Sequence, residues 1–161
     1  MNVFSDRRAR LAQALRAAGG GVAVIPTAPE RQRNSDNDHP YRHDSSFHYL
    51  TGFDEPQAWL VLADSGESTL LCRENDPAHE IWDGLRLGPA AAPAALGVSQ
   101  ALDVAALDTV MPEVLANHSA VWFPFGAHAT LAEQVDGQLI PAGVLVMDPV
   151  PPLALLVTVT V

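Results

Sequence analysis

The chain has 161 residues and carries nineteen acidic residues against nine cations, all of them arginine, for a formal net charge of −10. A charge of this sign repels phosphate backbones and disfavours nucleic-acid binding. The last uncharged stretch, 153–161, is too short to cross a bilayer as a helix, so we expect no membrane anchor there.

A chain of this length fits one domain with a substantial core. Its single cysteine, Cys72, cannot form an intramolecular disulfide and follows the apolar pair Leu70 and Leu71. We therefore expect a buried, neutral thiol and a reducing, cytoplasmic setting.

The first predicted element is a helix that Ser5 or Asp6 caps, with Leu11 and Leu15 on one face. The glycines at 19–21 stop it. A short apolar run, 22–25, then predicts a strand buried on both faces. The polar, proline-containing segment 27–44 predicts a long loop.

Alternation of residues from Ser46 to Thr51 predicts a strand that ends at Gly52. A β-hairpin is expected from strands 58–63 and 68–72, joined by the turn 64–67. Asp76 and Pro77 can then begin a helix that carries Ile81, Trp82 and Leu85.

Apolar residues from 102 to 116 recur at helical spacing, and 120–123 reads as another strand. A further short helix is predicted at 127–135, while 90–95 is alanine-rich. Alternating strands and helices with a hairpin predict an α/β domain with a mixed β-sheet flanked by helices.

The densest group of aromatic, charged and turn-forming residues runs from His39 to Pro56. It contains the pattern Pro-Tyr-Arg-x-x-Ser-x-Phe-x-Tyr-x-Thr-Gly-Phe-x-Glu-Pro, beginning at Pro40. This pattern resembles the amino-terminal domain of bacterial aminopeptidase P, an enzyme that removes an N-terminal residue preceding proline. The likeness extends to the segments 28–30, 34–36 and 80–88. It implies the creatinase and aminopeptidase P amino-terminal fold, with a ribonuclease H-like motif.

The resemblance also implies that a second, catalytic domain would accompany this one. In this family a second, pita-bread catalytic domain holds two metal ions, usually manganese, on two Asp, one His and two Glu. Carboxylates that bridge two ions can activate a water for attack on a peptide carbonyl. None of these ligands can be placed in this chain, so we expect it to be inactive alone and to bind a catalytic domain or other subunits, as a homo-oligomer.

The same resemblance singles out Trp82, which can project toward a neighbouring subunit's active site and contact a proline-containing substrate. The alternative is a core anchor beside Ile81 and Leu85. For the motif itself we expect structural roles, with Arg42 paired to Asp44 or Glu55. The motif residues are Tyr41, Arg42, Ser45, Phe47, Tyr49, Thr51, Gly52, Phe53, Glu55 and Pro56.

We expect residues 1–147 to form this domain and 148–161 to be a linker or tail. Residues 147–151 resemble the family's entry into the catalytic domain, whereas the uncharged continuation does not. A truncation or reading-frame change explains that tail, and a genuine terminal β-strand explains it equally well.

Two other classes of function stay open. A stand-alone module could bind protein partners through the surface that a catalytic domain would cover. A small metalloenzyme could use His39, His43 and His48 with Asp36, Asp38 and Asp44, although their spacing fits no helical metal motif.

Overall fold

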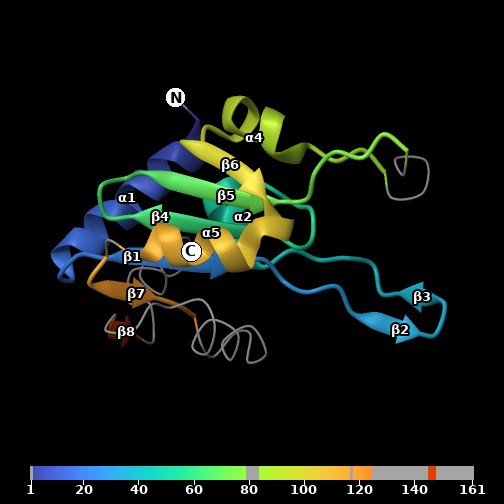
Figure 1. The fold of residues 1–161 in the computed structure, drawn as a ribbon, viewed down its shortest axis with the longest axis horizontal. Coiled ribbons are helices and arrows are strands. Elements are labelled where there is room, and N and C mark those ends of the chain that lie inside the picture. The colour runs from blue at the N-terminus through green and yellow to red at the C-terminus, as the bar shows by residue number, and fades with distance from the viewer. Residues whose placement is uncertain (1, 79–83, 117, 125–144, 148–161) are drawn as a thin grey trace.

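The computed structural model describes residues 2–78, 84–116, 118–124 and 145–147. Its centre is a six-stranded mixed sheet of order β6-β5-β4-β1-β7-β8, with helices on both faces (Figure 1). The strands are β1 (Val22–Pro26), β4 (Trp59–Ala63), β5 (Ser68–Cys72), β6 (Gln100–Asp103), β7 (Ala120–Trp122) and β8 (Leu145–Met147). The helices are α1 (Val3–Ala17), α2 (Ser45–Thr51), α4 (Gly88–Leu96) and α5 (Leu107–Leu115), with the short 3-10 helix η1 (Val104–Ala106). The predicted fold class is confirmed.

The predicted first helix forms, but its cap is Asn2, whose side chain accepts a hydrogen bond from Phe4 N at 3.1 Å. Gly19, Gly20 and Gly21 all have positive φ after its end. A Cβ at Gly21 would lie 2.4 Å from the carbonyl oxygen of Ala120, so only glycine lets β1 begin beside β7.

The buried strand β1 holds the sheet together by pairing antiparallel with β4 and parallel with β7. Its residues alternate between two cores. Ala23 and Ile25 face the core formed with α1, α2 and α4, whereas Val22 and Val24 face the core beneath α5. The predicted hairpin is confirmed in β4 and β5, as is the predicted strand at β7.

The predicted strand at 46–51 is wrong, because this segment is helix α2. Asp44 caps it by accepting from Phe47 N at 2.9 Å, and Gly52 ends it with φ 70°. Phe47, Leu50 and Thr51 are buried, at the i, i+3 and i+4 spacing of one helical face.

Two further predictions need correction. Residues 100–103 form strand β6, parallel to β5, so the helix expected from Leu102 begins only at Leu107. The alanine-rich segment lies in helix α4, which its composition alone did not predict. The predicted helix at 127–135 and the tail 148–161 lie outside the described residues.

The predicted loop at 27–44 contains a two-stranded hairpin, β2 (Gln32–Asn34) and β3 (Asn37–Asp38). Figure 1 shows this hairpin projecting from the body of the domain, at the end of the sheet where β1 finishes. No helix in the described part of the chain is long and apolar enough to cross a membrane.

Candidate functional site

The motif between Tyr41 and Pro56 fixes the region where the projecting hairpin joins the sheet. Phe47, Thr51 and Phe53 are buried in the core. The Thr51 hydroxyl donates to the carbonyl oxygen of Phe47 at 2.8 Å and accepts from Phe53 N at 3.0 Å, which fixes the chain as it leaves α2. A Cβ at Gly52 would lie 2.5 Å from the Phe4 ring, so a side chain there would displace α1.

The remaining motif residues tie this region to neighbouring elements. Tyr49 lies against Arg7, whose guanidinium carbon is 4.0 Å from the ring centre, and its hydroxyl accepts from Arg10 at 2.8 Å. Glu55 Oε1 accepts from Leu87 N at 2.8 Å, which connects the motif to the start of α4. The structural roles expected for these residues stay a prediction.

Pro56 is half-buried, whereas Ser45 and Arg42 are exposed. The pairing of Arg42 with Asp44 or Glu55 stays a prediction. Asp44 serves as the cap of α2, and Glu55 receives the Leu87 N–H described above.

Tyr41 is the motif residue that reaches the loop after β1. Its hydroxyl and that of Thr27 are 2.6 Å apart. Burial raises the pKa of Tyr41, and Glu30 and Asp44 raise it further, against opposing effects of the Thr27 hydrogen bond and Arg73. The phenol therefore stays neutral at neutral pH, and its hydrogen bond with Thr27 holds the side chain in place.

The histidines do not assemble as the metalloenzyme hypothesis requires. His43 and His48 stack with ring centres 4.0 Å apart and planes 15° from parallel. Within the described ranges, no group of three or more His, Cys, Asp or Glu side chains is placed to hold a metal ion. Cys72 is buried, and burial, reinforced by nearby carboxylates, raises the pKa of its thiol to about 12, as expected for an unreactive core cysteine.

The stacked histidines predict a pH effect on stability. Burial lowers the pKa of His48, and His43 and Arg7 lower it further, while Asp54 opposes them. The unfolded chain then binds this proton more readily, so the free energy of unfolding should fall as the pH drops below about 6.5. Urea denaturation between pH 5 and 7 should show a shallower dependence in His48→Gln. An unchanged slope in that variant would contradict the assignment.

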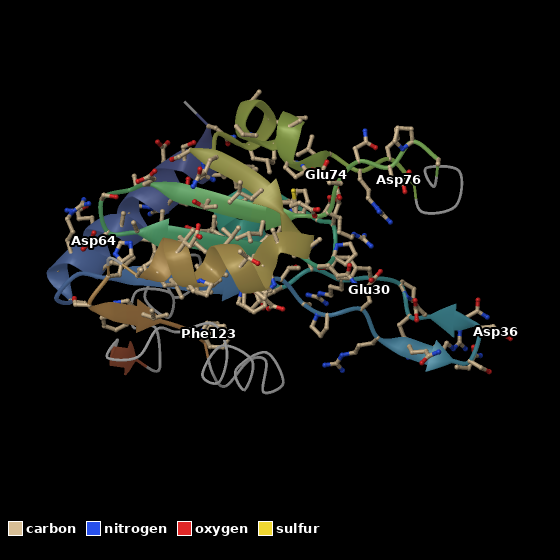
Figure 2. The ribbon with its side chains drawn as sticks, in the orientation of Figure 1. Glu30, Asp36, Asp64, Glu74, Asp76 and Phe123 are labelled. Atoms are coloured by element: carbon tan, nitrogen blue, oxygen red, sulfur yellow. The ribbon has the colours of Figure 1, made fainter. Side chains whose placement is uncertain are left out.

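Trp82 lies in 79–83, outside the described residues, so its predicted role is untested. Its surroundings can be described in part. Residues 84–87 are not helical and Leu85 is 83% exposed, so the predicted inward position of Leu85 is wrong. Figure 2 shows Glu74 and Asp76 on the segment that leaves β5 and runs away from the sheet.

Two surface grooves border the motif. One, of about 370 Å³, lies between the loop after β1 and the segment that enters α2, and it is lined by Arg31, His39, Tyr41, Arg42 and His43, among others. The other, of about 360 Å³, is more apolar and lies between the same loop and Trp59, Val104 and Leu107. Both lie at the end of the sheet from which the hairpin projects.

Comparison with known families and structures explains this arrangement. The family described as "Aminopeptidase P, N-terminal domain" matches residues 4–122. The chain belongs to this family. The Xaa-Pro aminopeptidase of Escherichia coli is 39% identical over 130 residues, which are 78% of this chain but 29% of that enzyme.

Solved structures agree with the assignment. The low-pH form of E. coli aminopeptidase P superposes with a TM-score of 0.82 at 34% identity, over 94% of this chain and 37% of that one. A zinc-substituted form of the same enzyme, solved with product, gives 0.74 at 32% identity, over 92% and 37% of the two chains. The chain thus spans about a third of the length of these relatives and matches their amino-terminal domain.

Proposed function

We propose that this chain is the non-catalytic amino-terminal domain of a manganese-dependent Xaa-Pro aminopeptidase, and that it contributes to subunit assembly and substrate access. One observation carries the proposal: the chain matches the E. coli enzyme over most of its own length but only 29% of the enzyme's. The catalytic domain would then be a partner of this amino-terminal domain.

The donor groups in the described residues support a non-catalytic role. A two-metal hydrolase needs carboxylates that bridge two ions and position a water between them. The described side chains form no cluster of that kind, and the acids labelled in Figure 2 lie spread along the domain from Asp64 to Asp36. Manganese would therefore be held by the catalytic domain, with no step of the reaction assigned to these residues.

Contact with substrate is proposed for Trp82. Leu85, three residues further along, already presents a large apolar side chain to solvent. An exposed leucine three residues after a tryptophan in the sequence favours burial of this part of the chain against another protein surface. We place that surface in a neighbouring subunit of a homo-oligomer, and we place the assembly in the cytoplasm, where an unpaired, buried cysteine such as Cys72 is the usual state.

The test is an aminopeptidase assay of the purified 161-residue chain on an Xaa-Pro peptide. We expect no release of the first residue, with or without Mn²⁺, because the described residues hold no group of carboxylates that could bridge two ions. The E. coli enzyme in the same assay provides the positive control. Metal-dependent release that co-purifies with the chain through successive columns would overturn the proposal.

A further inference from the structure

The two stacked histidines occupy defined positions around the start of helix α2. Asp44 is the N-cap, so His43 directly precedes the cap and His48 is the fourth residue of the helix. Apolar residues at these two positions often pack together as a hydrophobic staple, which fixes the angle at which the chain enters a helix. Here two imidazoles take that place, with ring centres 4.0 Å apart and planes 15° from parallel. We call the pair the histidine staple.

The helix side of the histidine staple packs against α1. The ring of His48 meets Phe4 edge-on, with ring centres 6.4 Å apart, and the guanidinium of Arg7 lies 5.4 Å from the centre of the Phe4 ring. Burial lowers the pKa of His48, and His43 and Arg7 lower it further, while Asp54 opposes them. The folded arrangement therefore favours a neutral His48 ring.

The other side of the histidine staple faces the groove beside the hairpin. The charged or titratable residues that line this groove with His43 are Arg31, His39, Tyr41, Arg42 and Asp44. Charges of both signs thus surround the pair, so the contact between the two rings decides its response to acid. Two neutral imidazoles stack without a Coulomb penalty, whereas two protonated rings at this separation repel each other.

The histidine staple also joins two parts of the structure. On one side, the first turn of α2 closes through Asp44, whose carbonyl oxygen accepts from His48 N at 3.0 Å and whose Oδ1 accepts from Phe47 N at 2.9 Å. On the other side, His39 N donates to the carbonyl oxygen of Arg31 at 2.9 Å, at the base of the projecting hairpin. The staple therefore sets how the hairpin segment enters α2.

We infer that the histidine staple is an acid-sensitive device, which holds segment 39–44 against α2 at neutral pH and opens when both rings are protonated. Opening leaves the sheet folded, because Phe47 and Leu50 keep α2 anchored in the core. Since the pKa of His48 is lowered, the staple stays closed at neutral pH and opens only as the pH falls below about 6.5. This inference goes beyond the proposed function, because it involves neither catalysis nor another subunit.

The experiment measures backbone hydrogen exchange of the 161-residue chain by NMR at pH 7.5 and 5.5, corrected for the intrinsic effect of pH on exchange. The protection of the Phe47 and His48 amides, which donate to Asp44, should fall at least about tenfold at the lower pH. At both pH values these amides should exchange faster than those of β1 and β4, because the staple opens without unfolding the sheet. The lower pH stays above the range in which aspartates ordinarily titrate, near about 3.9.

Two matched variants each remove one histidine from the same segment. His43→Phe keeps an aromatic ring on His48 but cannot be protonated, so the fall in protection should shrink to less than about threefold. His39→Phe removes an exposed histidine outside the staple and should keep the tenfold fall. A full pH effect in His43→Phe, or its loss in His39→Phe, would overturn the inference. Exchange of the Phe47 and His48 amides no faster than that of β1 and β4 would overturn it too, because opening would then require global unfolding.

Discussion

Replacing Arg8 by methionine should lower the free energy of unfolding by about 3 kcal/mol. Arg8 is 3% exposed, and its guanidinium donates to three carbonyl oxygens, those of Leu50, Leu96 and Gly97. These hydrogen bonds connect α1 to the end of α2 and the end of α4. Methionine can fill the space of the stem, but it leaves three acceptors without their donor.

Urea denaturation measures this effect directly. Arg10→Met is the matched control, because Arg10 lies on the same helix, is exposed and makes one hydrogen bond with Tyr49; it should cost at most about 0.5 kcal/mol. Arg8→Lys should fall between the two, since an ammonium keeps the charge but not the fork of donors. A loss for Arg8→Met no larger than for Arg10→Met would show that Arg8 does not hold the helices together.

Replacing Trp82 by alanine should leave the isolated chain nearly as stable as before, within about 0.5 kcal/mol, because we propose that its indole meets another subunit. A core tryptophan would cost about 3–5 kcal/mol instead. Trp122→Ala provides the comparison in the same chain, since Trp122 is 4% exposed and its Nε1 donates to the carbonyl oxygen of Gly20 at 3.0 Å.

The same Trp82 substitution should then lower catalysis in an assembled enzyme. In a chimera that joins residues 1–147 to the remainder of the E. coli enzyme, kcat/KM for an Xaa-Pro peptide should fall about tenfold or more, which corresponds to about 1.4 kcal/mol. A collapse of stability in the isolated Trp82→Ala chain, with the size seen for Trp122→Ala, would assign Trp82 to packing.

The sequence was sufficient for the centre of the fold because local patterns there agree with tertiary pairing. The run 22–25 and the hairpin around 64–67 form as predicted. At 46–51 the alternation of residues favours a strand, whereas the N-cap Asp44 and the left-handed Gly52 favour a helix. The helix signals at the two ends of the segment prevailed. Burial of Phe47, Leu50 and Thr51 on one face of the helix stabilises it further.

Other features depend on contacts too distant in sequence to be visible. Strand β6 is half-buried apart from the exposed Gln100 and has weak strand propensity, so its parallel pairing with β5 defines it. Arg8 looks like any surface cation of a helix, because its carbonyl acceptors are 42, 88 and 89 residues away.

Activity of the unmodified chimera tests the central claim most directly, namely that this chain serves as the amino-terminal domain of a metal-dependent Xaa-Pro aminopeptidase. We predict that residues 1–147, joined to the E. coli catalytic domain, restore Mn²⁺-dependent release of the residue before proline, above the level of the catalytic domain alone. A chimera that folds and binds metal but turns over no faster than that domain alone would contradict the account.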